Sequence, residues 1–376
     1  MSLSVRKGTS QSRDPAQAAQ ELFDSLQQPD IKFAVFYCAP EFDLPALAAE
    51  LHRRFGDIPM IGCTSAGEIT PQGYLAGSLT GFSLSSSELD AAVDVLSLDP
   101  FDSATARGRV QTLVQSLGAR NALPPNPTDT FGFMLIDGLA MQEEMVVSCV
   151  HEALQGIELI GGSAADDTRF VSTHVYHGGR FHQNVAVLAV VRTGLPFMAF
   201  RTQHFVKSEQ RMVVTKADPV RRIVSEINGR PAGREFARLV GLEINELTPL
   251  IFATHPVVVR VGGQYFVRSI AKVNPDESLT FFCAIDEGIV LTIAKGVDMV
   301  QNLREAFDKV HEAIGKPQLV LGCDCILRRL ETEREGIKDE IGRIFADNNV
   351  IGFATYGEQY NSMHVNQTFT GIAIGG

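Results

Sequence analysis

Three runs of small residues, each opened by a glycine and closed by an acid, are the segments whose residue types could bind a ligand. They span residues 62–68, 161–167 and 352–358. Small side chains let backbone N–H groups approach a ligand, and hydroxyl and carboxylate side chains can hydrogen-bond to it. A turn that needs glycine for its backbone angles and an acid for capping explains the same pattern. The candidate ligand-binding residues are Gly62, Cys63, Thr64, Ser65, Glu68, Ser163, Asp167, Gly357, Glu358 and Asn366.

Nucleophilic catalysis is a competing interpretation of the first run, with Cys63 or Ser65 as the attacking group. A nucleophile elbow needs Gly-x-Ser-x-Gly, whereas here one extra residue separates Gly62 from Ser65. The sequence shows no base for Cys63, no Walker loop and no Gly-x-Gly-x-x-Gly after a strand. We therefore expect that the protein is not an enzyme, and a Cys63-dependent enzyme is the remaining catalytic alternative.

The nine histidines are scattered, so their spacing predicts no multi-histidine metal centre. A haem iron, however, needs only one axial imidazole in an apolar pocket. His255, His204 and His364 are the candidates, and His255 has the most suitable apolar flank. A hydrogen-bonded structural histidine is the simpler interpretation of each. No Cys-x-x-Cys-His occurs, which excludes covalent c-type haem.

The runs belong to a longer repeat. An apolar strand precedes each run (residues 33–38, 131–137 and 318–324), a helical pattern follows that strand, and a further strand comes after the run. In the second copy this last strand, 185–191, arrives late, which an extra hairpin through residues 174–182 would explain. Strand, crossover helix and strand predict a right-handed βαβ unit with parallel pairing, and the third strand can pair antiparallel. The fold class is therefore α/β, with mixed sheets built from repeated strand, helix, strand, Gly-rich turn, strand units.

Two domains are expected. Residues 1–29 form an N-terminal segment with a helix, residues 30–200 hold two repeats, and residues 201–376 hold the third repeat at their C-terminal end. Within the second domain, Asp218-Pro219 is typical of a helix start and predicts a helix up to residue 228. Strands follow at 257–261, 265–269 and 279–285, and then an amphipathic helix over 297–314.

Composition limits the classes of function. The chain has 376 residues, 45% hydrophobic and 20% charged, which is typical of a packed globular protein. Its net charge of −11 and the lack of a basic run argue against nucleic acid as a partner. No apolar stretch reaches the roughly 20 residues that cross a bilayer, and the polar start lacks a signal peptide. We expect a cytoplasmic protein without membrane insertion, whose six cysteines are reduced.

Several motifs together resemble the FIST-domain family, with an N-terminal and a C-terminal FIST domain. They are residues 62–68, 161–166, 228–232 and the ending from Tyr356 to Gly371. The resemblance implies a sensory module that binds a small ligand and signals to partners such as histidine kinases or cyclic-di-nucleotide enzymes. Two-domain members without a fused output domain look like the NosP group, which the resemblance connects with haem b and nitric oxide.

The leading hypothesis is therefore a haem-based nitric oxide sensor, with His255 as the iron ligand, that regulates a histidine kinase or another signalling protein. The alternative is a module for a small metabolite such as an amino acid, whose ammonium group would face Glu68, Asp167 or Glu358. Both leave the oligomeric state open, and a homo-oligomer is compatible with the sequence.

Overall fold

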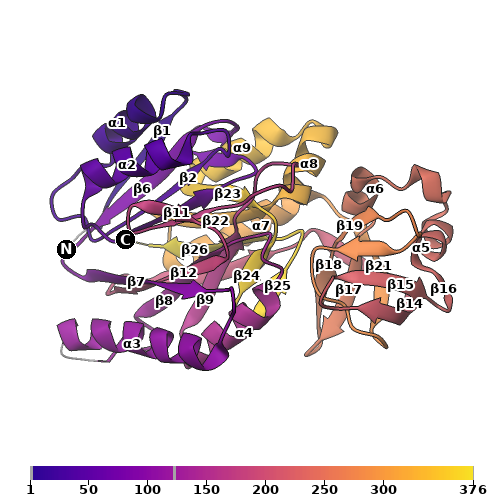
Figure 1. Ribbon diagram of the computed structural model, residues 1–376. Coiled ribbons are helices and arrows are strands. Elements are labelled where there is room, and N and C mark those ends of the chain that lie inside the picture. The colour runs from indigo at the N-terminus through magenta and orange to yellow at the C-terminus, as the bar shows by residue number, and fades with distance from the viewer. Residues whose placement is uncertain (1–2, 122–123, 376) are drawn as a thin grey trace.

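The computed structural model describes residues 3–121 and 124–375 and divides into a larger and a smaller body. Figure 1 shows both ends of the chain in the larger body, whereas the smaller body carries residues 205–296. The larger body contains three copies of one strand and helix pattern. The expected mixed α/β architecture is thus confirmed.

The three repeats follow the same order of elements, except that the third has two helices between its parallel strands. The first comprises β1 (Ser4–Ser10), α1 (Pro15–Leu26), β2 (Phe33–Cys38), α2 (Leu44–Phe55), β3 (Met60–Thr64), β4 (Glu68–Thr70), β5 (Gly73–Leu75) and β6 (Leu79–Ser85). The second comprises β7 (Leu89–Ser97), α3 (Ser103–Asn121), β8 (Thr130–Ile136), α4 (Glu143–Ala153), β9 (Glu158–Ser163), β10 (Val175–His177), β11 (Arg180–His182) and β12 (Val185–Thr193). The third comprises β13 (Phe197–Thr202), α7 (Met299–Ile314), β22 (Leu319–Cys325), α8 (Ile326–Glu335), α9 (Lys338–Asp347), β23 (Val350–Thr355), β24 (Glu358–Tyr360), β25 (Met363–Val365) and β26 (Phe369–Ile374).

The smaller body is an insertion into the third repeat, between β13 and α7. It comprises β14 (Phe205–Asp218), β15 (Ile223–Ile227), β16 (Arg230–Pro231), α5 (Ala232–Val240), η1 (Ile244–Glu246), α6 (Pro249–Thr254), β17 (Val257–Val261), β18 (Gln264–Arg268), β19 (Ile270–Val273), β20 (Leu279–Phe281) and β21 (Val290–Gly296). Its strands form a sheet of their own. The two connecting segments lie together, because Val297 N donates to His204 O at 2.8 Å. We call this body the inserted domain.

Each repeat lends a short hairpin to the sheet of another repeat. Hairpin β10–β11 extends the first sheet at β3, β24–β25 extends the second at β9, and β4–β5 extends the third at β23. Within each sheet the two βαβ strands are parallel and the last strand is antiparallel to them. The exchange is cyclic, so the larger body has a pseudo-threefold arrangement that no single repeat completes.

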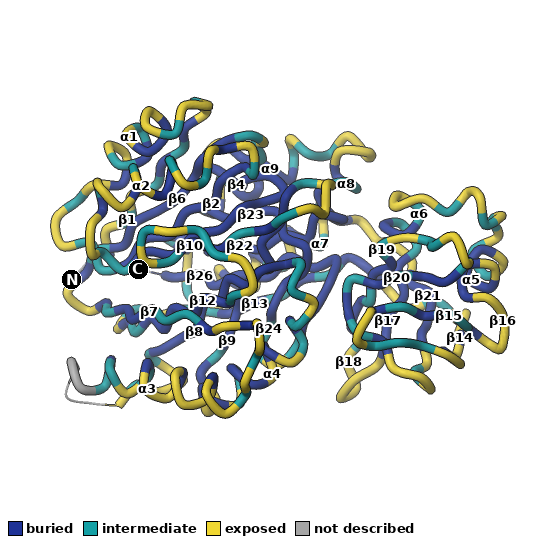
Figure 2. Tube along the Cα trace, viewed as in Figure 1, coloured by how far each residue is buried: buried dark blue, intermediate teal, exposed yellow. Residues whose placement is uncertain are grey.

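The inner faces of the three sheets enclose one apolar core. Phe33, Phe133 and Leu321 contribute from the three central strands, and all three are fully buried. Separate clusters lie between the outer faces and the helices. Figure 2 accordingly shows the central strands buried and the helices with exposed outer surfaces. Strands buried on both faces explain the continuous apolar runs in the sequence.

Aspartate caps start the helices of the first repeat. The Asp14 carboxylate accepts from Gln17 N at 2.7 Å at the start of α1, and Asp43 accepts from Ala46 N at 3.0 Å at the start of α2. Each satisfies a helix N–H that has no partner within the helix. A proline in the first turn follows each cap, where its fixed backbone angle suits a helix.

Two expectations about elements were wrong. Residues 218–228 form a turn and strand β15 rather than a helix, because Asp218 Oδ1 accepts from Arg221 N in a turn and Arg222 has a positive φ of 56°. The hairpin in the second repeat is not extra, since all three repeats have one. The late strand arises instead from a longer loop before it, residues 166–174.

The expected domain limits, 1–29, 30–200 and 201–376, remain a prediction. The strands of these three segments are not separated in the same way in the fold. β1, from the N-terminal segment, pairs with β6 in the first sheet. The third repeat lies in the larger body, where its β23 pairs with β4. Within the described ranges, no helix is long and apolar enough to cross a membrane.

Candidate functional site

The three glycine-rich runs meet at one end of the pseudo-threefold body. Backbone hydrogen bonds join them in a ring. The bonds run from Ala66 N to Ala354 O (2.9 Å), from Ala165 N to Thr64 O (3.0 Å) and from Ser163 N to Gly357 O (2.8 Å). The ring places the runs beside the inserted domain, because Ala253 and Phe282 of that domain pack in the same apolar cluster as Ala66 and Ala165.

One position breaks the symmetry of this ring. Ala66 and Ala165 hold the same offset in the first two runs, and Tyr356 holds it in the third. The Tyr356 hydroxyl donates to the Asp166 carboxylate and lies 2.8 Å from Asp167 O. Burial, and the hydrogen bond to Asp166, raise the pKa of the Tyr356 hydroxyl. The neutral phenol of Tyr356 therefore fills the position that corresponds to the methyl groups of Ala66 and Ala165.

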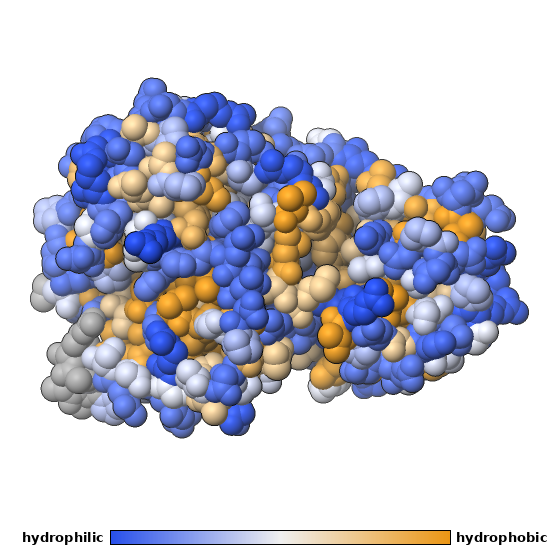
Figure 3. All heavy atoms as spheres, viewed as in Figure 1, coloured by the Kyte–Doolittle hydropathy of each residue, from blue (hydrophilic) through white to orange (hydrophobic). Residues whose placement is uncertain are grey.

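Asp166 also holds the long loop of the second repeat. Its carboxylate accepts from the backbone N–H groups of Phe170 (2.9 Å), Val171 (2.8 Å) and Ser172 (2.8 Å). The Phe170 ring consequently stacks on the Tyr356 ring, with centroids 4.6 Å apart, and lies 5.9 Å from the Phe282 ring of the inserted domain. Phe170 is still 46% exposed. Figure 3 shows a strip of apolar side chains where the two bodies meet.

His364 and Asn366 lie buried beside this ring. They are 2% and 0% exposed, and neither ring nitrogen of His364 and neither amide atom of Asn366 has a hydrogen-bond partner among the described residues. Burial lowers the pKa of His364, although Glu143 and Glu144 oppose the shift, so the ring is neutral. Gly357 allows the close packing, because a Cβ there would lie 2.2 Å from His364 Cε1 and 3.0 Å from Asn366 Nδ2. We call His364, Asn366 and Gly357 the junction site.

The inserted domain is fastened to the larger body around the junction site. Arg222 donates to Glu143 Oε2 at 2.5 Å and to Glu144 Oε2 at 2.8 Å, at the start of α4. Arg268 Nη1 donates to the backbone oxygen of His364 at 3.1 Å. Gln367 bridges to the inserted domain through Ser269 Oγ (3.0 Å) and Ala253 O (2.6 Å). These polar contacts lie beside the apolar cluster that Ala253 and Phe282 form with the larger body. Polar contacts of this kind are typical of interfaces between domains that move relative to each other.

Glu68 and Glu358 occupy equivalent buried cages. Glu68 accepts from Ser65 Oγ (2.5 Å) and Ser78 Oγ (2.7 Å), and Glu358 accepts from Thr355 Oγ1 (2.5 Å) and Thr368 Oγ1 (2.6 Å). Burial raises the pKa of Glu68 to about 7 and that of Glu358 to about 8. Both side chains are fully buried, and their hydrogen bonds hold their own turns.

Asp167 differs from these two acids. In the paired hairpins, Glu68 lies opposite Phe353 and Glu358 opposite Gly162, whereas Val175 takes this place in the second repeat, opposite Cys63. Asp167 lies in the preceding loop with a positive φ of 61° and pairs with Arg329 at 2.6 Å. The equal spacing in the sequence thus did not mean an equal position in the fold.

The other residues of the first two runs are structural. Gly62 faces the Phe36 ring, which a Cβ would meet at 2.5 Å, and Cys63 lies in the central core. Thr64 Oγ1 accepts from His174 N (3.1 Å), and Ser163 Oγ accepts from Gln359 Nε2 (3.1 Å). Burial raises the pKa of Cys63 well above its ordinary value. A raised pKa disfavours the thiolate, which is the form of a cysteine that attacks as a nucleophile.

The other two candidate histidines lie apart from the junction site. His204 is buried, with Nδ1 2.8 Å from Arg328 Nη1 and Nε2 2.9 Å from Glu331 Oε2. Both nitrogens are engaged, so His204 does not fit an iron ligand. His255 ends α6, and its Nδ1 lies 3.0 Å from Thr254 Oγ1 and 3.3 Å from Ile251 O. No hydrogen bond in the described part of the chain engages its Nε2.

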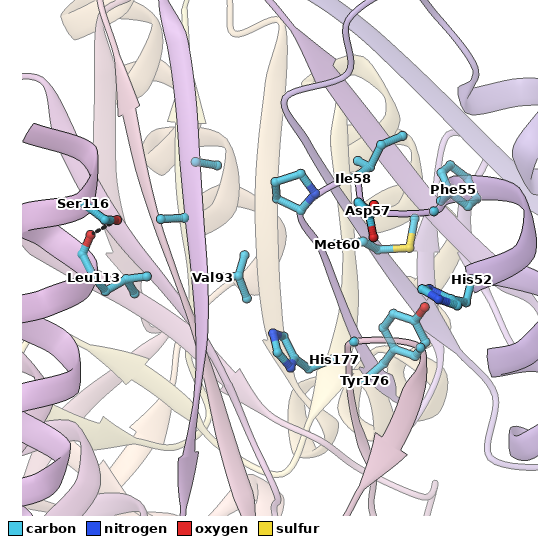
Figure 4. A pocket seen from close by; sticks show the side chains of 16 residues that line it. His52, Phe55, Asp57, Ile58, Met60, Val93, Leu113, Ser116, Tyr176 and His177 are labelled. Carbon is cyan, nitrogen blue, oxygen red and sulfur yellow. Dashed lines mark hydrogen bonds between the residues drawn. The ribbon is translucent and has the colours of Figure 1, made fainter. Parts of the chain in front are cut away.

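Two neighbouring sheets of the larger body meet where the edge strand of one lies beside the hairpin at the edge of the next. We call such a place a seam. Between β7 and the β10–β11 hairpin, a cavity of about 390 Å³ lies between helices α2 and α3. Figure 4 shows His52, His177 and Tyr176 on one side, facing Val93, Leu113 and Ser116. A second cavity, of about 220 Å³, lies at the corresponding seam between β13, α7 and Tyr360 at the end of β24. Small ligands favour such clefts between structural units.

Sequence reasoning missed several residues that shape the site. Tyr356 had a visible signal, because it aligns with Ala66 and Ala165 in the repeated run. Arg222 had none, since its partners Glu143 and Glu144 are far away in the chain and its segment was predicted as a helix. Phe170 lies in the loop whose length had been assigned to a hairpin.

A threefold-repeated α/β body with an inserted domain and a buried polar junction defines the class. The FIST N domain model matches residues 32–230 and the FIST C domain model matches residues 232–361. The chain therefore belongs to the FIST-domain family. FIST domains are sensory ligand-binding domains, so membership supports a general sensory role for this protein.

Comparison with curated proteins gives a match to an uncharacterized protein of Methanocaldococcus jannaschii. The two are 23% identical over an alignment that covers 64% of this chain and 53% of that protein. The chain thus spans about half the length of the curated relative that it matches.

Among solved structures, the chain resembles a cyanuric acid hydrolase with a TM-score of 0.40 and 8% identity, over 100% of both chains. A cyanuric acid hydrolase from A. caulinodans gives 0.38 and 10%, over 100% of this chain and 99% of that one. Because both are enzymes, the expectation that this protein is not an enzyme is corrected, and that exclusion does not stand. Scores this low assign neither a substrate nor a reaction to this chain.

Proposed function

We propose that the protein is a sensory protein that binds a small polar molecule at the junction site and transmits the binding through the inserted domain. The observation that carries this proposal is the pair of fully buried side chains, His364 and Asn366, without hydrogen-bond partners among the described residues. Buried polar groups in native proteins are nearly always paired, and an unmade hydrogen bond of this kind costs about 1–3 kcal/mol.

The chemistry of these two side chains indicates the class of ligand. A neutral imidazole and a carboxamide each offer one donor face and one acceptor face. The matching ligand carries donors and acceptors itself, as a free amino acid or a small amide does. Glu144, whose side chain is 32% exposed, supplies a carboxylate nearby, and Arg268 supplies a cation. This proposal retains the metabolite alternative and moves it from the acids of the turns to the junction site.

Access requires the inserted domain to move, because the junction site is closed to solvent. The connecting segments at His204 and Val297 are the covalent links between the two bodies, and the polar contacts of Arg222 and Gln367 are the elements that must separate. A ligand that binds only one arrangement shifts the population toward it. The altered surface would then be read by a histidine kinase or a cyclic-di-nucleotide enzyme.

The test is thermal unfolding with a panel of amino acids and small amides at 10 mM. A ligand at about 100 times its Kd raises the free energy of unfolding by about 2.7 kcal/mol. We expect a rise in Tm for at least one compound, lost in His364→Asn and in Asn366→Ala. His311→Asn, on the exposed face of α7, is the matched control and should keep the full shift. An equal shift in all four proteins would remove the junction site from the proposal.

Haem binding at His255 is the second candidate, and one observation favours it. Its Nδ1 lies next to a backbone carbonyl and a hydroxyl. The lone pair of Nε2 is then available to a metal ion, which is the arrangement typical of ligating histidines. Haem iron supplies a coordination position for a diatomic gas such as nitric oxide. His255 would hold the iron through its Nε2.

Absorption spectra of protein reconstituted with ferrous haem, before and after nitric oxide, test this candidate. A sharp stoichiometric Soret band that shifts with nitric oxide supports it, and His255→Ala should then lower the haem content while His311→Ala should not. A broad band without stoichiometry, or an unchanged haem content in His255→Ala, rejects His255 as the ligand.

A further inference from the structure

The guanidinium group of Arg201 lies at the seam between β13 and the β24–β25 hairpin, and no carboxylate of the described residues pairs with it. Arg201 Cζ is 4.5 Å from the centroid of the Phe266 ring and 5.6 Å from that of the Tyr360 ring. Its Nη1 is buried and has no hydrogen-bond partner in the described structure. The two rings hold the cation by cation–π attraction and fix its orientation, but they do not satisfy its N–H groups.

A second cation, Arg268, lies near Arg201, although the chain as a whole carries −11. Arg268 is close enough to lower the pKa of Arg201, which burial lowers first. Among the described residues, neither arginine forms an ion pair with a carboxylate. Two acids lie near: Glu305 lines the adjoining cavity, and Glu158 acts on Tyr360, with its own pKa raised by burial.

The adjoining cavity offers further donors. It measures about 220 Å³, and its polar lining comprises Arg201, Thr202, Asn302, Glu305, Lys309 and Tyr360. Thr202 Oγ1 donates to Asn302 Oδ1 at 2.5 Å, which orients the amide and leaves Asn302 Nδ2 as a donor. Lys309 adds an ammonium group from α7. A fixed guanidinium, an amide N–H and an ammonium around one small cavity are the groups that bind oxyanions.

We propose that this cavity binds a small oxyanion, a carboxylate or a phosphate, with Arg201 as its principal ligand. The corresponding seam between the first and second repeats supports the assignment by contrast. At that seam Arg109, on α3, is paired with Asp94 at 2.9 Å, and His177 ends β10 as Tyr360 ends β24. Arg201 differs from Arg109, because within the described ranges it has two aromatic rings and no carboxylate partner.

The site adjoins both bodies, because Phe266 belongs to the inserted domain and Tyr360 to the larger body. Oxyanion binding at Arg201 does not depend on a ligand at the junction site, and the two sites are tested with different probes. A bound oxyanion would complete the hydrogen bonds of Arg201 and neutralise the charge that it shares with Arg268.

Isothermal titration calorimetry of the full chain with inorganic phosphate, methyl phosphate and acetate, in a chloride buffer of constant ionic strength, tests the proposal. We expect saturable binding of at least one probe by the wild type, and at least tenfold weaker binding by Arg201→Gln. Arg201→Lys keeps the positive charge but loses the paired N–H groups of the guanidinium, so its affinity for the probe should lie between those of the wild type and Arg201→Gln. Arg260→Gln, an exposed arginine on β17, is the matched control and should bind as the wild type does.

Phosphate and acetate separate the two sources of oxyanion chemistry by their relative affinity. If Arg201→Gln unfolds, Lys309→Gln replaces it, because this side chain lies on α7 and lines the cavity; a severalfold loss of affinity is expected. Absence of binding by the wild type at 10 mM of every probe, or equal affinity in the wild type, Arg201→Gln and Lys309→Gln, would overturn the proposal.

Discussion

The hydroxyl of Tyr356, in the third repeat, donates a hydrogen bond to the carboxylate of Asp166, in the second repeat. Since Asp166 also accepts three backbone N–H groups of the loop that follows it, one side chain connects the ring of turns, the long loop and the Phe170 ring. The contact therefore positions the Phe170 ring, which packs near the Phe282 ring of the inserted domain.

Tyr356→Phe tests this contact. Removing the hydroxyl leaves the Asp166 carboxylate without one donor in a buried place, so the free energy of unfolding should fall by about 1–3 kcal/mol. Urea denaturation measures the loss. Tyr265→Phe is the control, because no hydrogen bond of its hydroxyl is found in the described structure, and it should change the free energy by less than about 0.5 kcal/mol. Equal effects of the two substitutions would contradict the role of Tyr356.

Gly357→Ala should destabilise the protein by about 1–3 kcal/mol, because its Cβ would lie 2.2 Å from His364 Cε1 in a packed region. Gly108→Ala is the matched substitution. Gly108 lies in α3 with open space around its Cβ position, and alanine favours a helix over glycine by about 0.5–1 kcal/mol. Thermal unfolding should thus shift in opposite directions, and a neutral Gly357→Ala would show that the junction site is loosely packed.

Glu358→Gln should flatten the dependence of stability on pH. Burial raises the pKa of Glu358 from 4.5 to about 8, so the folded state keeps a proton that the unfolded chain releases. The folded state binds more protons between about pH 4.5 and pH 8, and the free energy of unfolding must fall as the pH rises through this window. The difference between 8 and 4.5, at about 1.4 kcal/mol per pKa unit, makes the part due to Glu358 on the order of 5 kcal/mol, and glutamine removes it.

Urea denaturation at pH 5, 6, 7 and 8 measures this slope for the wild type and for Glu358→Gln. Glu68→Gln should act in the same direction over a narrower window, because the pKa of Glu68 is raised only to about 7. Asp308→Asn, an exposed acid on α7, should keep the wild-type slope. A slope unchanged in both buried variants would mean that these carboxyls are ionised in the folded protein.

Arg222→Ala should loosen the inserted domain. Arg222 is 4% exposed and its partner Glu143 is 1% exposed, so the substitution leaves a buried carboxylate uncompensated, at a cost of about 3–5 kcal/mol. Limited proteolysis should cut earlier near residues 203 and 297, where the two bodies are connected. Arg221→Ala, next to it and exposed, is the control. Unchanged cleavage in Arg222→Ala would show that other contacts hold the domain.

The native protein should show almost no reactive thiol. All six cysteines are free and buried, and burial raises the pKa of Cys63 and of Cys323 well above the ordinary value. Titration with a thiol reagent at neutral pH should therefore detect six groups only after denaturation. Rapid reaction of one thiol in the native state, located by mass spectrometry at Cys63, would revive the thiol-enzyme alternative.

The repeats were predictable because each is encoded locally. Glycine and alternating or continuous apolar runs determine β2, α2 and β3 within one stretch of chain, and the same pattern recurs at β8 and at β22. The expected helix at Asp218 failed, because Asp-Pro also begins a turn, and the strand pairing of Ile223 with β14 outweighed the local signal.

The sequence by itself determined the mixed α/β class, the three repeats and the glycine-rich turns that close them, because these follow from short-range periodicity and backbone sterics. Only the tertiary structure decided that each hairpin joins another repeat's sheet, that Glu68 and Glu358 turn inward while Asp167 points to Arg329, and that His364 and Arg201 lie beside the inserted domain. These depend on contacts between segments far apart in the chain, where burial and pairing are settled by the partner and not by the residue's own neighbours.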